Sequence, residues 1–413
     1  MTNQMKKIFS YGISVDRNFG GPSLVSGLDA TLHAIYGSEG YLLVHYQLND
    51  VELVNEAAMP FKIKKIPYTG IQIFKAWFKH VILHIRASGR EEKEFWDDFR
   101  QADIVYNIYG ICFCSKLNSG VTRIKLFAGL RSAVSSFAIN ILARVSGKMS
   151  LKGTSSYGPM KSSAEMSAAR VASRYIFDRM LAREKESRRQ MREVANVKSA
   201  IPVAPDVANM MPCSVKWNEA GPVGISVSFQ IIKQWGGRSD YLDMMADLIK
   251  YMHAQTGRDV VVFPNELKPS GVYGDAEVAS DIVARVHDRG KWLSVCEASQ
   301  ISGLEMKNRV AGCSVMVAAR YHSCVAALSS GVPLLVIGWH YKYEELMLLY
   351  DQRSRMIRTD ECSSQILKTR FDELWEKRNE VHDSIEDTAV KVRSCVIESI
   401  KYLLGMNLEY GNG

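Results

Sequence analysis

The chain has 413 residues, which is more than one ordinary hydrophobic core takes up, so we expect two domains. Its apolar content of 47% excludes a disordered or fibrous protein. The net charge of +8 is too small an excess to indicate a nucleic-acid partner, but it suits an anionic metabolite or the face of an acidic membrane.

Features that would place the chain in or across a membrane are missing from the sequence. No apolar run reaches the roughly 20 residues of a membrane span, and the start of the chain does not resemble a signal peptide. The 8 cysteines are scattered, and the one close pair, Cys112 and Cys114, does not have the spacing of a metal site. We therefore expect free thiols, no metal and a cytoplasmic location.

The first half of the chain predicts an α/β domain with two turn-rich loops. Strands are expected at 7–11, 41–46, 63–66 and 104–109, and helices at 24–36, 71–85 and 164–173. The loops are Asp16–Ser23 and the glycine- and hydroxyl-rich stretch Gly153–Pro159.

A long basic and amphipathic segment, Val121–Met149, has two interpretations. Its apolar residues recur at helical spacing, beside Lys125, Arg131 and Arg144. A helix lying on the inner face of the membrane would suit a lipid-linked substrate. We favour a helix that packs on its own core, because most amphipathic helices of globular proteins do so.

The second half predicts a parallel sheet. Apolar strands at 223–228, 259–263, 292–295, 314–317 and 334–337 alternate with helical segments, as in βαβ units. A proline-rich stretch at 201–212 marks a domain edge. We expect an N-terminal domain over residues 1–205, a C-terminal Rossmann-like domain over 220–360, and C-terminal helices over 361–413 that pack back on the first domain.

Three side chains that can bind an anion follow two successive strands of this second domain. Arg320 and His322 come after the strand 314–317, and Lys342 comes after the strand 334–337. Ligands of open α/β sheets bind at the carboxyl ends of strands, and a helix that begins there adds partial positive charge. Each residue taken singly is more often structural, but together they predict a site for a phosphorylated, carboxylated substrate.

Four short motifs occur along the chain. They are Ser156-Tyr157-Gly158-Pro159, Arg183-Glu184-Lys185-Glu186-Ser187, Pro205-Asp206-Val207-Ala208, and Arg320-Tyr321-His322 with Gly331-Val332-Pro333 and Lys342 after it. In this order they resemble the motifs of the polysaccharide pyruvyl transferase family. The resemblance covers roughly residues 10–350 and is strongest from 175 onward.

The resemblance implies two Rossmann-like domains facing a cleft, as in GT-B glycosyltransferases, with phosphoenolpyruvate as donor and no cofactor. Arg183 and Arg320 would bind the donor's carboxylate and phosphate, in an order left open, and Lys342 would stabilise the departing phosphate. His322 is the candidate acid–base group, because imidazole titrates near neutral pH.

The acceptor, a sugar of a surface or exopolysaccharide or its lipid- or nucleotide-linked precursor, is expected on the N-terminal side. Candidate contacts are Asp16, Asn18, Ser156 and Tyr157. The family usually opens with an Asn-x-Gly-Asp-type loop, whereas this chain has Asn18-Phe19-Gly20-Gly21, which lacks the acid. The nature of the acceptor therefore stays open.

Two other functions fit the same sequence. A GT-B glycosyltransferase with a nucleotide-sugar donor would also need a basic crevice, and fold alone does not exclude it. A non-enzymatic scaffold of polysaccharide assembly is the second alternative, although the joint presence of Arg183, Arg320, His322 and Lys342 argues against a lost site.

Overall fold

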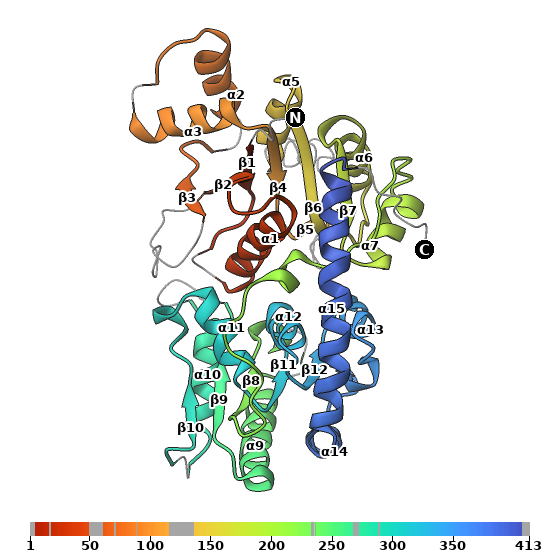
Figure 1. The fold of residues 1–413 in the computed structure, drawn as a ribbon. Coiled ribbons are helices and arrows are strands. Elements are labelled where there is room, and N and C mark those ends of the chain that lie inside the picture. The colour runs from red at the N-terminus through yellow and green to blue at the C-terminus, as the bar shows by residue number, and fades with distance from the viewer. Residues whose placement is uncertain are drawn as a thin grey trace.

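The structure is a computed structural model that describes residues 5–15, 18–48, 61–69, 72–87, 89–114, 136–232, 235, 237–266, 272–287 and 290–406. Two α/β domains, each built on a parallel sheet with helices on its faces, lie end to end (Figure 1). In the part of the chain described, no helix is long and apolar enough to cross a bilayer.

The N-terminal sheet has 7 strands in the order β3-β2-β1-β4-β6-β5, with β7 also paired to β6. All pairs are parallel. The strands are β1 Lys6–Tyr11, β2 Tyr41–Gln47, β3 Lys62–Lys65, β4 Ile104–Asn107, β5 Ile111–Cys112, β6 Met149–Tyr157 and β7 Arg179–Ala182. The helices are α1 Gly20–Tyr36, α2 Gln72–Trp77, α3 Arg90–Gln101, α5 Ala138–Val145, α6 Ser163–Val171 and α7 Lys185–Arg189.

The stretch Gly153–Tyr157, expected as a loop, is instead the end of the buried strand β6, which corrects the sequence prediction. Its small residues are required by close packing: a Cβ on Gly153 would lie 2.5 Å from the hydroxyl oxygen of Tyr106 on β4. Polar side chains can lie in this buried strand because they have internal partners, such as Lys152 Nζ, which donates to Ser155 Oγ at 2.6 Å.

The long helix expected over 121–149 is only partly open to comparison, because 115–135 lie outside the described residues. Helix α5 ends at Val145, and Met149 already belongs to β6. The described helix buries Ile139, Leu142 and Ala143, so this part faces the core, as we favoured from the sequence.

The C-terminal sheet has 6 parallel strands in the order β10-β9-β8-β11-β12-β13. The strands are β8 Val223–Ser226, β9 Val260–Phe263, β10 Leu293–Val295, β11 Val315–Ala318, β12 Leu334–Gly338 and β13 Met356–Arg358. The helices are α8 Phe229–Ile232, α9 Arg238–Thr256, α10 Asp275–Ala284, α11 Gly303–Ala311, α12 Tyr321–Ser329 and α13 Tyr341–Leu349. The five strands expected here are confirmed, and the short edge strand β13 is an addition.

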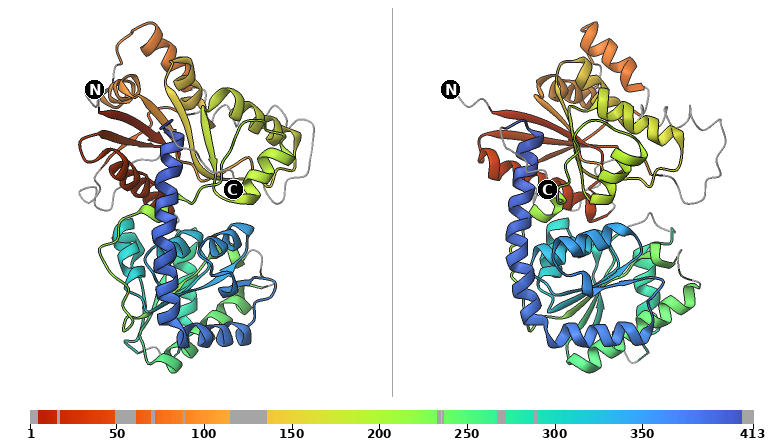
Figure 2. Two further views of the ribbon diagram at one scale, coloured as in Figure 1. Left: turned by 45° about the vertical axis from the view of Figure 1, so that its right-hand side comes forward. Right: turned by 90° about the vertical axis from the view of Figure 1, so that its right-hand side faces the viewer.

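The C-terminal helical stretch is two helices, α14 Ser364–Glu376 and α15 Arg378–Leu403. Helix α14 packs on the C-terminal domain, where Tyr251 of α9 donates to Asp372 at 2.6 Å. Helix α15 runs along both domains (Figure 2), and Arg179 of β7 donates to the carbonyl of Leu403 near its end.

The N-terminus of α1 is pinned to the C-terminal domain. Asn18 forms an isolated antiparallel bridge with Glu266, and the Phe19 N–H donates to the Asn265 carbonyl at 3.2 Å. Further along the helix, a Cβ on Gly27 would lie 2.0 Å from the carbonyl oxygen of Val207, in the connection between the domains. The chain therefore holds α1 directly against the carboxyl edge of the second sheet.

Candidate functional site

The predicted Arg, His and Lys residues lie at one edge of the C-terminal sheet. Strands β11 and β12 are hydrogen-bonded neighbours, so the loops that leave their carboxyl ends converge. Arg320 precedes the first residue of α12, His322 lies in the first turn of α12, and Lys342 lies in the first turn of α13.

Arg320 is held by two carboxylates. Its Nε donates to Asp275 Oδ2 at 2.8 Å, its Nη2 donates to Asp275 Oδ1, and the same Nη2 donates to Glu266 Oε2 at 2.9 Å. Burial works against this charge, but Asp275 and Glu266 together raise the pKa of Arg320 above its usual value. The guanidinium therefore stays charged, with its planar fork already occupied by Asp275.

Asp275 organises this edge of the sheet. It is completely buried, and besides Arg320 it accepts from the backbone N–H groups of Phe229 at 2.9 Å and Glu266 at 2.9 Å. One carboxylate thus fixes the segments that follow β8, β9 and β11.

Arg183 follows β7 and is also enclosed by acceptors. Its Nε donates to Glu184 at 2.8 Å, its Nη1 to Asp206 at 2.8 Å and its Nη2 to Ser156 Oγ at 2.5 Å. The side chain is only 3% exposed. Although burial disfavours the charge, Tyr321, Glu184 and Asp206 hold the pKa of Arg183 well above its usual range.

Tyr321 lies between the two domains' cations. The Arg183 guanidinium carbon is 4.4 Å from its ring centroid, and Lys342 Nζ is 5.4 Å from the same centroid. Lys342 Nζ also faces Trp339 at 5.1 Å and Tyr343 at 5.6 Å. The aromatic rings around Lys342 attract its positive charge but do not neutralise it.

Lys342 differs from both arginines in having no carboxylate partner among the residues that the structure describes. It is 9% exposed. Burial, reinforced by the charge of Arg183, lowers the pKa of Lys342 to about 7. A small anion entering this edge would favour the protonated amine.

His322 has a buried ring nitrogen without a partner. Its Nε2 makes no hydrogen bond within the described part of the chain. Burial lowers the pKa of His322 to about 4, opposed by Asp206 and reinforced by Arg183 and Lys342, so the free protein carries a neutral imidazole at pH 7. A Cβ on Gly20 would lie 2.4 Å from Nδ1, so α1 packs directly on this ring.

The two helices that meet here begin differently. Asn18 Oδ1 accepts from the N–H groups of Gly20 at 2.9 Å and Gly21 at 3.1 Å, so the start of α1 is capped. No described side chain caps α12. Its first turn therefore adds partial positive charge beside His322 and Lys342.

The predicted acceptor-side residues do not form a common surface. Asp16 lies outside the described residues. Asn18 caps α1, and Ser156 is buried between Arg183 and Glu184. Tyr157 is fully buried and donates its hydroxyl to the Leu181 carbonyl at 3.0 Å, so its side chain belongs to the core.

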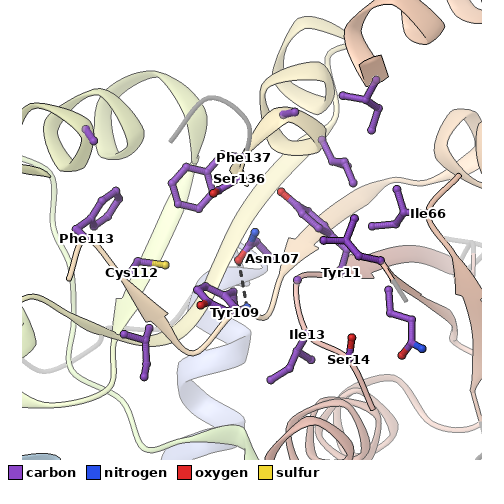
Figure 3. A pocket seen from close by; sticks show the side chains of 18 of the residues that line it. Tyr11, Ile13, Ser14, Ile66, Asn107, Tyr109, Cys112, Phe113, Ser136 and Phe137 are labelled. Atoms are coloured by element: carbon purple, nitrogen blue, oxygen red, sulfur yellow. Dashed lines mark hydrogen bonds between the residues drawn. The ribbon is translucent and has the colours of Figure 1, made fainter. Parts of the chain in front are cut away.

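A cavity of about 730 Å³ lies in the N-terminal domain at the carboxyl ends of its strands (Figure 3). Five aromatic side chains line it: Tyr11, Tyr68, Tyr109, Phe113 and Phe137. The polar lining includes Gln47, Asn107 and Glu165, and Asn107 Oδ1 accepts from the Tyr109 N–H at 3.2 Å. Of the predicted acceptor contacts that the structure describes, Asn18, Ser156 and Tyr157, none lines this cavity.

The cavity lies beside the cationic edge. Gly110, next to the lining residue Tyr109, sits so close to Arg183 that an added Cβ would be 3.7 Å from Nη1. Burial raises the pKa of the Cys114 thiol in the cavity wall, Glu165 adds to this, and the charge of Lys342 opposes it. One face of the cavity therefore lies near Arg183 and Lys342.

Sequence reasoning missed two parts of this arrangement. Asp275, Glu184 and Asp206 neutralise the arginines, and only the fold brings Asp275 across 45 positions to Arg320. The cavity residues come from five separate strand ends and carry no motif of their own. Polar and aromatic residues in the last half of a predicted strand, such as Asn107 and Tyr109 in the strand expected at 104–109, were the available signal.

A family model described as polysaccharide pyruvyl transferase matches residues 124–341, more than half of the chain. A search of curated proteins found no match. Similar solved structures include a Listeria monocytogenes protein assigned as a UDP-N-acetylglucosamine 2-epimerase (12% identity, 98% of each chain covered, TM-score 0.59).

Two further structures are similar over nearly the same length. They are MnaA of S. aureus with UDP (12% identity, 98% of this chain and 99% of that one, TM-score 0.56) and a glycosyltransferase from Rickettsia africae ESF-5 (9% identity, 98% and 100%, TM-score 0.55). At these identities the likeness shows the fold alone, which is the expected GT-B arrangement. The family match, which covers more than half of the chain, shows that the chain belongs to the polysaccharide pyruvyl transferase family.

Proposed function

We propose that this protein transfers an enolpyruvyl group from phosphoenolpyruvate to a sugar of a surface or exopolysaccharide, or of its precursor, and closes it as a pyruvate ketal with release of phosphate. The family match supports the reaction class. The observation that carries the proposal is that two groups lie at the same edge of the C-terminal sheet. They are Lys342, which lacks a carboxylate partner among the described residues, and the buried Nε2 of His322, which has no hydrogen-bond partner among them.

Phosphoenolpyruvate carries nearly three negative charges, which require donors that are not already neutralised. Lys342 and the uncapped first turn of α12 meet this need. Arg320 keeps Nη1 without a hydrogen bond within the described chain, so it can still contribute one donor. Arg183 as a donor ligand stays a prediction, because its guanidinium bonds are occupied in this conformation.

The chemistry needs one proton delivered to carbon and two removed from oxygen. Protonation of the enol CH2 carbon makes C2 electrophilic, and a sugar hydroxyl adds there and loses its proton. The C2–O bond to phosphate then breaks, phosphate leaves with that electron pair, and a second hydroxyl adds to C2 and loses its proton. One of the two protons removed balances the proton given to carbon, and the other ends on the phosphate, which is released as hydrogen phosphate. His322 is the proposed acid–base group and Lys342 the group that stabilises the departing phosphate.

A neutral imidazole cannot give a proton, so His322 must gain one when the donor binds. The anionic groups of phosphoenolpyruvate oppose the effect of burial that lowers the pKa of His322 to about 4 in the free protein. The proposal therefore couples donor binding to proton uptake.

The cavity in the N-terminal domain supports a sugar acceptor. Its aromatic lining offers faces on which the C–H side of a sugar ring can stack, and Asn107, Gln47 and Glu165 offer polar contacts. Its position beside Arg183 and Lys342 would bring an acceptor hydroxyl towards the donor.

Calorimetry separates this proposal from a glycosyltransferase, whose nucleotide-sugar donor would use the same fold. We expect phosphoenolpyruvate to bind the full chain, with a heat that changes with the ionisation enthalpy of the buffer because a proton is taken up. A nucleotide sugar should not compete. Tight binding of a nucleotide sugar, with none of phosphoenolpyruvate, would replace the proposal by the alternative.

A further inference from the structure

An exposed apolar cluster projects from the N-terminal domain. Helix α2 continues into a π-helical turn, η2 Phe78–Ile82, and a short tip follows. Four large apolar side chains here are about half exposed: Phe78 52%, Ile82 46%, Leu83 53% and Ile85 47%. We call these four residues the apolar tip. They lie at the end of the domain that is far from the C-terminal domain (Figure 1).

The apolar tip is ordered by hydrogen bonds that leave its side chains outside. The Leu83 N–H donates to the Phe78 carbonyl at 3.0 Å, and the Ile85 N–H donates to the Lys79 carbonyl at 3.1 Å. The buried ring of His80 donates to the Ile85 carbonyl at 2.7 Å. The local backbone conformation therefore keeps these apolar side chains exposed to solvent and not packed in the core.

Basic residues surround the apolar tip. From residue 57 to residue 90 the sequence has 7 Lys and Arg and no Asp or Glu. Lys75, Lys79 and Arg86, which flank the tip, are exposed. The nearest acidic helix, α3, has part of its charge neutralised, because Lys64 pairs with Glu94 and Asp98 at 3.3 and 2.8 Å.

We propose that the apolar tip docks on the surface of an anionic phospholipid bilayer, with Lys75, Lys79 and Arg86 against the headgroups. Half-exposed aromatic and aliphatic side chains next to Lys and Arg are the pattern of interfacial membrane contacts. A second copy of the chain fits less well, because four side chains on one short projection offer far less than the roughly 800 Å² per partner of a stable dimer.

The same segment reaches the cavity. Ile66, Tyr68 and Ile73, just before the apolar tip, line it. Docking would therefore set the cavity at the bilayer, where a sugar attached to a lipid could enter. This choice of a lipid-linked acceptor rests on the proposed function, whereas docking itself does not.

Co-sedimentation of the full chain with vesicles tests the docking. We expect binding to vesicles of phosphatidylcholine and phosphatidylglycerol in equal amounts, weakened by salt, and little binding to phosphatidylcholine alone. Phe78→Ser with Ile82→Ser, and separately Lys75→Glu with Lys79→Glu, should each weaken binding about tenfold or more. Leu348→Ser with Val390→Ser, and Lys250→Glu with Lys391→Glu, change exposed residues on other faces and should bind as the wild type does.

Each outcome decides the proposal. Circular dichroism confirms that the variants are folded, and a soluble acceptor should be turned over at the wild-type rate by both tip variants. Absence of vesicle binding by the wild type, or equal loss in the control pairs, overturns docking at this tip. Docking is also overturned if light scattering shows that the wild type is a dimer and that the tip variants are monomers. If the protein binds vesicles but does not bind phosphoenolpyruvate, only the proposed reaction is contradicted, and docking at the tip is supported.

Discussion

Gly20 at the start of α1 packs directly on the ring of His322, with the position of its missing Cβ only 2.4 Å from Nδ1. The first helix of one domain thus touches the acid–base candidate of the other. Any side chain at position 20 must push the helix and the ring apart, which ties the spacing of the two domains to the site.

We therefore expect Gly20→Ala to lower both stability and donor binding. Overpacking of this kind costs about 1–3 kcal/mol in the free energy of unfolding, and the displaced ring should weaken phosphoenolpyruvate binding. Urea denaturation and calorimetry measure the two effects. Gly89→Ala is the matched control, because its nearest neighbour would be 3.9 Å away. Equal effects of the two substitutions would contradict the contact.

Lys342 predicts a pH dependence of donor binding. Its pKa of about 7 in the free protein means that the charged form falls about tenfold for each pH unit above that value, so phosphoenolpyruvate affinity should fall with rising pH. Lys342→Arg keeps its charge, so its affinity should fall less steeply between about pH 7 and about pH 9, because only the proton taken up at His322 still contributes. Exposed Lys250→Arg should follow the wild type. A wild-type affinity that is flat over this range would exclude Lys342 as the donor's cation.

Asp275 should matter for stability and not only for binding. Asp275→Asn removes the charge that holds Arg320 and weakens the backbone contacts of the same carboxylate, and breaking a buried pair costs about 3 kcal/mol. The more exposed Asp281→Asn, which loses a pair with Arg238, should cost about 1 kcal/mol or less. Urea denaturation of both variants checks this, and an Asp275 variant as stable as the wild type would refute its organising role.

Tyr109 should affect the acceptor and not the donor. It lines the cavity, and the next residue, Gly110, lies close to Arg183. Tyr109→Ala removes a stacking face, so we expect KM for the sugar acceptor to rise about tenfold while the affinity for phosphoenolpyruvate stays within about twofold. Tyr175→Ala, at an exposed tyrosine that does not line the cavity, is the control. A reversed pattern would place the acceptor elsewhere.

His45 predicts acid sensitivity of the fold. It is fully buried, with Nδ1 2.7 Å from Ser10 Oγ and Nε2 2.9 Å from the Ile13 carbonyl, and burial lowers its pKa to about 4. The unfolded chain, in which the pKa is about 6.5, binds a proton that the folded chain does not, so stability falls as the pH drops from about 6.5 to about 4.

At about pH 5 this loss is about 2 kcal/mol for His45 alone. When the pH is lowered from neutral to about 5, the free energy of unfolding of His45→Gln, measured by urea denaturation, should therefore fall by about 2 kcal/mol less than that of the wild type. An unchanged slope in His45→Gln would show that this ring is protonated in the folded state.

The convergence of Arg320, His322 and Lys342 could be predicted because it follows from local order alone. Two apolar strands in sequence, each followed by polar residues and a helix, place those residues at one edge once the strands are neighbours. Their charge state could not be predicted. Whether an arginine is neutralised depends on Asp275, whose distance from Arg320 is set by the tertiary fold.

Strand β6 was missed for a different reason. Its Gly153, Thr154, Ser155 and Ser156 favour turns in isolation, yet the fold buries them against Tyr106, Lys152 and Arg183. Tertiary packing here overrides local preference. The same packing buries Tyr157 in the core. The cavity is lined instead by residues such as Tyr109, which local sequence patterns did not single out.

The most direct test of the proposed reaction is to follow phosphate release from phosphoenolpyruvate together with the mass of a panel of sugar acceptors, for the wild type and for folded His322→Ala. We predict that the wild type releases one phosphate for each acceptor that gains a pyruvate ketal, and that the variant does neither. Phosphate release by His322→Ala at the wild-type rate, or release without any ketal, would contradict the account.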